Sequence, residues 1–166
     1  VNACATTILA ELYLEGAYDA DNAEMYTYLR DNNLLPMAQP FGQAPWYYFG
    51  IESVSEVGDI PTDVTDWVLL ALYNENTNEW VAEKAGFLLK NGTVQAVDGT
   101  VGLSMTGLTS GESYIMVARV RNHLAVASAQ AINIPQTGAY AFTEPNNVLG
   151  GEEQLVPIGG GLHGLI

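Results

Sequence analysis

Hydrophobic and polar positions alternate most regularly along residues 112–121, inside a longer apolar stretch that covers residues 103–134. This period of two indicates a β-strand with one buried face and one partly exposed face. A second apolar run, residues 124–134, follows after only Asn122 and His123. Because a crossover between parallel strands needs many more residues, the two runs are predicted to form an antiparallel β-hairpin at the centre of the fold.

Shorter apolar runs bounded by turn residues predict the other strands. Asn91-Gly92 is the strongest of these hairpin signals, because both turn residues are expected to take positive φ. Six short strands between residues 64 and 134, separated by turn signals, favour an all-β antiparallel sandwich over an α/β fold. Besides the central hairpin, strands are expected at residues 6–15, 64–73, 79–90, 93–97 and 101–105.

Two stretches break this pattern of short strands. Residues 22–31 place Met25, Tyr28 and Leu29 at helical spacing after Asn22, which predicts one short helix or a structured loop. Residues 34–50 hold three prolines, which exclude long regular structure, and a cluster of aromatic residues. We expect this proline-rich segment to pack as a lid over one end of the core.

Length and hydropathy favour one soluble domain that covers residues 1–166. A chain of 166 residues can bury a core without metal or disulfide support. No window approaches the length of a membrane-spanning helix, and no basic segment precedes an apolar one at the start of the chain. We therefore expect no membrane span, and an export signal that was removed or never present.

The chain is strongly acidic, with 19 Asp and Glu against 5 Lys and Arg and a formal net charge of −14. Residues 1–79 hold 13 of the acids and a single base, Arg30. Nucleic acid is excluded as a partner because phosphate binding needs clustered basic residues. A solvated acidic surface explains the charge, with cations or basic surfaces as the other partners that it suits.

Carboxylates offer the only candidate metal ligands. Asp19, Asp21 and Glu24 lie close together in a polar stretch that could present oxygen atoms to calcium, although the glycine and final glutamate of an EF-hand are missing. A solvated helix start is the competing interpretation. A weaker second candidate consists of Asp59, Asp63 and Asp66.

Catalytic motifs are missing from the sequence. His123 and His163 stand without a nucleophile at motif spacing, and the single cysteine, Cys4, excludes an internal disulfide or a cysteine-based zinc site. Glu52 and Glu56 could form an acid pair, but nothing else indicates a glycosidase. We expect no enzymatic activity, and we expect Arg119 and Arg121 to pair with acids such as Asp66 on neighbouring strands, not to bind a ligand.

Collinear segments that cover most of the chain carry a family resemblance. They include LEGAYD, DWVLLAL, AGFLLKNGTVQAVDG and YIMVARVRNHLAV, and the sequence departs from the family at Val120, where histidine is usual. The chain resembles a C-terminal β-sandwich module of large secreted, adhesin-like surface proteins of environmental Gram-negative bacteria. The resemblance implies an immunoglobulin-like or transthyretin-like sandwich with a structural role outside the cell. The matching segments are residues 14–19, 34–41, 66–72, 87–99, 114–126 and 158–164.

Both ends of the chain carry apolar residues that would form sticky strips if they were exposed in a monomer. We therefore predict an extracellular structural protein that assembles into a homopolymeric filament or surface layer by strand exchange through residues 1–8 or 148–166. The competing hypothesis is that both ends fold back to complete their own sandwich. The chain would then be a monomeric cell-surface adhesion or glycan-binding module, with Trp46, Tyr47, Tyr48 and Phe49 as the ligand surface. The residues expected to link subunits are Val1, Ala3, Ile8, Leu155, Val156, Ile158, Leu162, Leu165 and Ile166.

Overall fold

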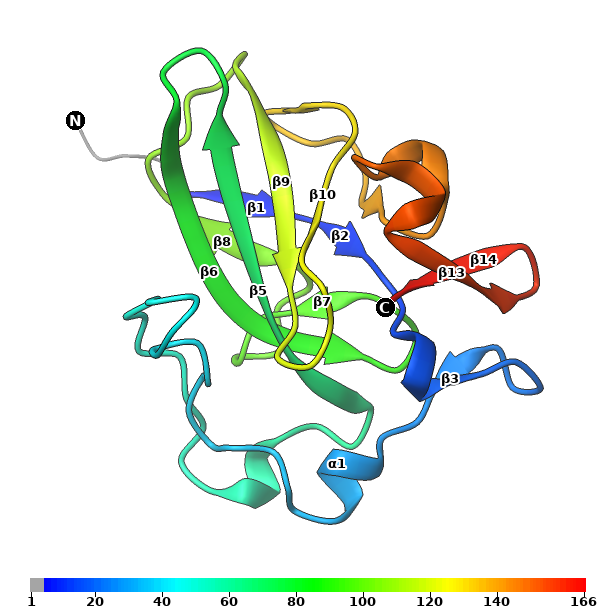
Figure 1. Ribbon diagram of the computed structural model, residues 1–166. Coiled ribbons are helices and arrows are strands. Elements are labelled where there is room, and N and C mark those ends of the chain that lie inside the picture. Colours follow the sequence, from blue (N-terminus) through cyan, green and yellow to red (C-terminus); the bar gives the residue numbers. More distant parts are fainter. Residues whose placement is uncertain (1–4) are drawn as a thin grey trace.

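Two long strands form the centre of the fold in the computed structural model, which describes residues 5–166. β5 (Val64–Asn74) and β6 (Glu79–Leu89) pair antiparallel along most of their length. β9 (Ser113–Arg119) pairs antiparallel with the other edge of β5, so β5 lies in the middle of the sheet. The hairpin predicted from residues 64–73 and 79–90 is confirmed, and Figure 1 shows these three strands side by side.

The central hairpin predicted at residues 112–134 is also confirmed, but its second half is divided. β10 (Val126–Ala127) and β11 (Ile132–Asn133) each pair antiparallel with β9. Between them, the amide of Ala129 donates to the carbonyl of Asn147 at 2.9 Å instead of to β9. This contact with a later segment interrupts the strand, and the apolar pattern of residues 124–134 gives no sign of it.

Both faces of β5 are buried, which explains why its sequence is apolar almost without interruption. Val68, Leu70 and Leu72 belong to the larger core cluster on one face. Trp67 and Leu69 belong to a second cluster on the opposite face. The alternation of side chains therefore places β5 between two core clusters. Other segments of the chain must cover each cluster.

Short strands from the beginning and middle of the chain cover the first face (Figure 1). β1 (Thr6–Ile8) pairs antiparallel with β8 (Leu103–Met105), and β2 (Ala10–Glu11) pairs parallel with β12 (Tyr140–Ala141). The sequence predicted one strand over residues 6–15, and this is wrong in its extent. The strand breaks at Leu9, whose amide and carbonyl are both bonded to the side chain of Gln136, at 2.8 and 3.0 Å.

The helix predicted at residues 22–31 is reduced to one turn, α1 (Tyr28–Asp31). The preceding residues form a two-stranded hairpin instead, β3 (Tyr18–Asp19) and β4 (Glu24–Met25), with Ala23 at a positive φ of 56°. The amide of Met25 donates to the carbonyl of Lys90 at 2.7 Å, so the main body of the fold holds this segment in an extended conformation. That long-range bond outweighs the weak local preference for helix.

The turn at Asn91-Gly92 connects β6 to the short return strand β7 (Val94–Gln95), as predicted. Of the two turn residues, only Gly92 takes a positive φ, at 85°. The expectation that both would do so is therefore wrong. The amide of Gly92 donates to the carbonyl of Leu89 at 2.9 Å, and the Asn91 carboxamide accepts from the amide of Thr93 at 3.1 Å.

The proline-rich segment, residues 34–50, covers the second face of the sheet, as the lid interpretation predicted. It contains no helix or regular strand. Leu35, Phe41 and Tyr48 are buried in the second core cluster together with Trp67 of β5. The indole nitrogen of Trp67 also donates to the carbonyl of Pro36 at 2.9 Å, which ties the lid to the sheet.

The C-terminal segment folds onto its own chain. β13 (Leu155–Gly159) and β14 (Leu162–Leu165) form a hairpin, and the amide of Leu165 donates to the carbonyl of Tyr13 at 2.8 Å. Figure 1 shows this red hairpin beside the blue N-terminal strands. The short 3-10 helices of the chain are η1 (Glu15–Ala17), η2 (Val57–Asp59), η3 (Pro145–Asn147) and η4 (Gly151–Glu153).

This arrangement buries several of the apolar residues that were expected to link subunits. Ile8, Leu155 and Leu165 are at most 2% exposed, and all three belong to the first core cluster of their own chain. Val156, Ile158 and Leu162 are half-buried, and Ile166 is exposed. Val1 and Ala3 lie outside the described residues, as does Cys4. Assembly through the ends stays a prediction, and it would require buried residues to leave their own core.

Antiparallel pairing dominates, and the strands account for the architecture, so the all-β prediction is confirmed. In residues 5–166, no helix has the length and apolar character needed to span a membrane.

Candidate functional site

Aromatic side chains of the lid lie near an aromatic residue of β6, because Trp46 and Trp80 line the same hollow. We call Trp46, Tyr47, Phe49 and Trp80 the aromatic face. Tyr47, Phe49 and Trp80 are 63%, 79% and 52% exposed, which is unusual for rings of this size. Exposed apolar side chains that gather in one area, and do not lie singly, mark binding surfaces in soluble proteins.

Trp80 is held in place by charged and aromatic neighbours from three strands. The guanidinium carbon of Arg119 lies 4.8 Å from the centroid of the Trp80 ring, and the Tyr73 ring packs on Trp80 at 5.2 Å. Nη1 of Arg119 donates to Oε1 of Glu83 at 2.9 Å. Arg119 and Glu83 come from the two strands that flank β5, where Arg119 is opposite Leu69 and Glu83 is opposite Ala71. These contacts fix the orientation of the exposed Trp80 ring.

Two neighbouring hollows accompany the aromatic face. One, of about 390 Å³, lies among Pro45, Trp46, Trp80 and Arg119. The other, of about 500 Å³, runs beside residues 81–84 of β6 and is bordered by Phe49. The two hollows are adjacent, because Glu83 contributes to the lining of both. The combined surface offers ring faces with a few well-placed charged groups, which is the usual make-up of a small-molecule site.

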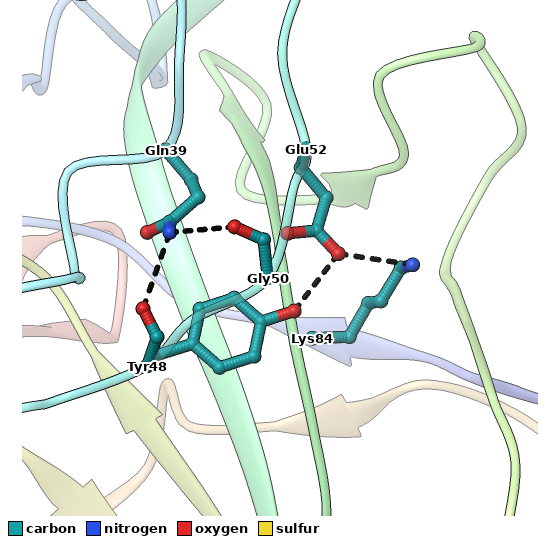
Figure 2. A network of polar contacts seen from close by, with 5 residues as sticks. All are labelled: Gln39, Tyr48, Gly50, Glu52 and Lys84. Carbon is teal, nitrogen blue, oxygen red and sulfur yellow. Dashed lines mark hydrogen bonds and ion pairs between the residues drawn. The ribbon is translucent and has the colours of Figure 1, made fainter.

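A buried polar network anchors the loop that carries Phe49, as Figure 2 shows. The hydroxyl of Tyr48 donates to Oε1 of Glu52 at 2.8 Å, and Nζ of Lys84 lies 2.9 Å from the same oxygen. Nε2 of Gln39 donates to the carbonyls of Tyr48 and Gly50 at 3.2 and 3.0 Å. These bonds fix the backbone on both sides of Phe49 and hold its ring at the surface.

Glu52 is an unusual centre for this network because its carboxylate is only 6% exposed. Its second oxygen, Oε2, has no hydrogen-bond partner in the described part of the chain. Gly50 makes the arrangement possible, since an added Cβ at Gly50 would overlap with the Tyr48 hydroxyl and with Glu52 Oε2. Burial, and then the hydrogen bond and charge of Glu52, raise the pKa of Tyr48 above its usual value, so the phenol stays protonated as the donor.

The backbone of Tyr47 lies in the left-handed region, with φ at 51°. This conformation is energetically unfavourable for residues other than glycine, and such strain is common at binding and catalytic sites. The amide of Tyr48 donates to the carbonyl of Phe41 at 2.9 Å, which helps to impose the conformation. The result is an exposed Tyr47 ring that turns away from the core while Tyr48 turns into it.

The structure gives two of the three carboxylates of the proposed calcium site, those of Asp19 and Glu24, other hydrogen-bonding or charged neighbours. Oδ2 of Asp19 accepts from the Asn22 carboxamide at 2.7 Å, and Oδ1 accepts from the amide of Asp21 at 3.0 Å. The carboxylate of Glu24 pairs with Nζ of Lys90 at 2.8 Å. No group of three metal-ligating side chains occurs among residues 5–166. Calcium here stays a prediction, and binding would require Glu24 to leave Lys90.

The other acidic candidates are dispersed. Asp59 and Glu56 form the capping box of η2, and Asp66 is buried and accepts from Nη2 of Arg121 at 2.7 Å. The prediction that both arginines pair with acids is therefore confirmed, but Arg119 pairs with Glu83 of β6 across the intervening strand β5. Glu52 lies in the buried network while Glu56 is exposed at the cap, so they occupy different environments.

The two histidines have no catalytic arrangement around them in the described residues. His123 is half-buried, and burial lowers the pKa of its imidazole below the usual value, against the opposing effect of Asp66 and Glu15. Nδ1 of His123 and Nδ1 of His163 are buried without a hydrogen-bond partner in the same part of the chain. Neither ring faces an identified nucleophile.

Sequence reasoning identified the lid residues of the aromatic face but missed Trp80, Glu83 and Lys84. For Arg119, the sequence predicts only an ion pair with an acidic residue. A usable signal was present, because Trp80 and Glu83 lie in the polar half of a strand whose other half is apolar, EWVAE before KAGFLL. Polar and aromatic residues at the exposed end of a buried strand indicate a surface with a role beyond packing.

No protein-family model matches this chain, and neither curated proteins nor solved structures give a match.

Proposed function

We propose that this chain is a surface adhesion module that binds a neutral polysaccharide through the aromatic face. The observation that carries the proposal is the set of exposed, pre-positioned rings beside two hollows that share Glu83. The proposal adopts the aromatic ligand surface that the sequence indicated at Trp46–Phe49 and extends it with Trp80 and Arg119.

Sugar rings present apolar C–H faces and hydroxyl edges, and the aromatic face provides a partner for each. The rings of Phe49 and Trp80 supply flat apolar surface at a low cost in conformational entropy. The carboxylate of Glu83 and the guanidinium of Arg119 supply acceptors and donors at the edge of the rings. The arrangement is largely pre-formed, which reduces the entropy lost on binding.

Charge selects the class of polysaccharide. The chain carries a formal net charge of −14, so a highly anionic polymer would be repelled at moderate ionic strength. Neutral polysaccharides, which are rich in hydroxyl groups, are not subject to this electrostatic repulsion. We therefore assign neutral glycans as the ligand class and an extracellular or cell-surface location as the setting, in agreement with the family resemblance.

Native gel electrophoresis through gels that contain a dissolved polysaccharide tests this proposal. We expect the protein to be retarded by at least one neutral polymer of a panel of mannan, xyloglucan, dextran and soluble β-glucan. Alginate, which is anionic, serves as the charge control and is expected to have no effect. Unchanged mobility in every neutral polymer would contradict the proposal.

Self-assembly by strand exchange is a second candidate function, and one observation favours it. β1 pairs with β8 over only three residues, while its Ile8 side chain fills a fully buried position in the core. A strand of this kind can be supplied by a second copy with the same contacts, which is domain swapping. Light scattering over a range of concentrations is expected to show discrete oligomers if exchange occurs. A monomer at all concentrations would remove this candidate.

For the fold type, we propose a sandwich in which β1, β2 and β8 form the second layer opposite the long sheet. The pairing of β9 with both β5 and β10 in a mainly antiparallel sheet supports an immunoglobulin-like or transthyretin-like arrangement. This proposal gives the chain a scaffold role, with no reaction assigned.

A further inference from the structure

A cavity lies away from the aromatic face, at the junction of β4, α1 and the start of β5. It has a volume of about 760 Å³. Its apolar lining includes Leu14 and Met25, and two exposed tyrosines, Tyr26 and Tyr28, belong to its wall. A cavity of this size suits a small organic molecule.

The lining of this cavity is rich in negative charge. Four carboxylates contribute to it, from Asp19, Glu24, Asp31 and Asp66. Lys90 pairs with Glu24 and Arg121 pairs with Asp66. Asp19 and Asp31 have no ion pair within residues 5–166, so the cavity keeps a negative charge that a cationic ligand would neutralise.

Two pKa shifts agree with this charge balance. The hydrogen bond from the Asn22 side chain lowers the pKa of Asp19, which keeps this carboxylate ionised at neutral pH. The charge of Asp19 in turn raises the pKa of the Tyr26 phenol. His123 also lines the cavity, and because burial lowers the pKa of its imidazole, it adds no positive charge near pH 7.

Two residues of the lining, His123 and Thr65, each carry a buried polar atom without a hydrogen-bond partner in residues 5–166. The side chain of Thr65 lines the cavity and is only 4% exposed, yet its Oγ1 has no hydrogen-bond partner among the described residues. Buried hydroxyl groups are normally hydrogen-bonded, so an unpaired one beside a cavity indicates a place where a ligand atom can bind. A ligand N–H group would supply the missing donor.

We propose that this cavity binds a small organic ammonium ion with an apolar or aromatic body. The ammonium group would donate to Thr65 Oγ1 and lie in the field of Asp19 and Asp31. The apolar body would pack on Met25 and on the rings of Tyr26 and Tyr28, whose faces also attract cations. This site is independent of the polysaccharide surface.

Titration of the ¹⁵N-labelled protein with 2-phenylethylammonium chloride, followed by NMR, tests the proposal. The neutral probe 2-phenylethanol has nearly the same shape and serves as the control for hydrophobic binding. We expect shifts of the amides of residues 24–31 and Thr65, and a Kd for the cation about tenfold lower than for the alcohol. Equal affinity for the two probes, or shifts confined to other regions, would overturn the proposal.

Two variants make the test specific. Thr65→Val keeps the shape of the side chain and is expected to weaken cation binding by about tenfold, because one hydrogen bond to a charged group is lost. Asp31→Asn is expected to weaken it by about threefold, since the change removes one charge near the cavity mouth. Glu75→Gln, an exposed charge change outside the cavity, is the matched control and should leave the Kd unchanged. Unchanged affinity in both test variants would also overturn the proposal.

Discussion

The guanidinium of Arg119 lies over the ring of Trp80, with 4.8 Å between the guanidinium carbon and the ring centroid. The same guanidinium is bonded to Glu83, so one side chain orients both an exposed aromatic ring and an acceptor group of the proposed glycan surface. The contact joins the end of β9 to the beginning of β6 across β5. Folding of the sheet therefore also positions the residues of the proposed glycan surface.

Arg119→Met tests the orienting role of this contact. The change keeps much of the apolar stem but removes the donor to Glu83 and the charge over Trp80. We expect a loss of about 1–2 kcal/mol in the free energy of unfolding, from one part-buried ion pair and one cation–π contact. Polysaccharide binding should weaken as well. Urea denaturation and gel retardation measure the two effects, and an unchanged stability with unchanged retardation would contradict the assigned role.

The strained backbone at Tyr47 predicts a separation of stability from binding. Tyr47→Gly relieves the left-handed conformation, whereas Tyr47→Ala removes the same ring and keeps the strain. We expect the glycine variant to be more stable than the alanine variant by about 1 kcal/mol. Both variants should bind polysaccharide more weakly than the parent protein. Thermal unfolding of the pair is the measurement, and an alanine variant as stable as the glycine variant would show that the strain is absent.

The network around Glu52 predicts non-additive effects. Lys84→Met leaves a carboxylate that is 6% exposed without its cation, and we expect a loss of about 2–4 kcal/mol in the free energy of unfolding. In the double variant Glu52→Gln with Lys84→Met, the charge is gone while Tyr48 keeps an acceptor. The double variant should therefore be more stable than Lys84→Met alone. Additive losses in a double-mutant cycle would exclude the proposed coupling.

His123 predicts a decline of stability at mildly acidic pH. Its pKa is lower in the folded protein than in the unfolded chain, so the unfolded chain binds the proton more readily. The neutral imidazole therefore contributes to the free energy of unfolding. This contribution is fully present above the usual histidine pKa and is lost as pH falls through the lower pKa of the folded protein. His123→Gln should flatten the pH dependence of the unfolding free energy below about pH 6.5. His163→Gln is the control, and a slope that persists in His123→Gln would contradict the assignment.

Local patterns predicted the long strands well because their side chains follow one period over many residues. β5 and β9 were located to within a few residues, and the turn at Asn91-Gly92 was placed correctly. Local patterns failed at Leu9 and at residues 22–27. There the conformation depends on partners more than 60 residues away, Gln136 and Lys90, and no local sequence pattern reports such contacts.

The candidate site was predictable only in part for the same reason. The aromatic cluster at residues 46–49 is visible as a composition, and its proximity to prolines indicates a surface loop. The association with Trp80 and Arg119 arises from the register of three strands, which places residues from distant segments on one face. The burial of Leu155 and Leu165 likewise follows from a hairpin that docks against Tyr13, and an apolar tail alone does not distinguish docking from exchange.

Removal of the Trp80 ring tests the claim that the aromatic face binds a neutral polysaccharide. The measurement is the Kd for the retarding neutral polysaccharide, obtained by isothermal titration calorimetry for the parent protein, Trp80→Ala and Tyr28→Ala. Both rings are exposed, at 52% and 68%, but Tyr28 belongs to the separate cavity. The account predicts a Kd at least about tenfold higher for Trp80→Ala, the loss expected for a central aromatic anchor, and an unchanged Kd for Tyr28→Ala. Equal affinities for the parent protein and Trp80→Ala would contradict it.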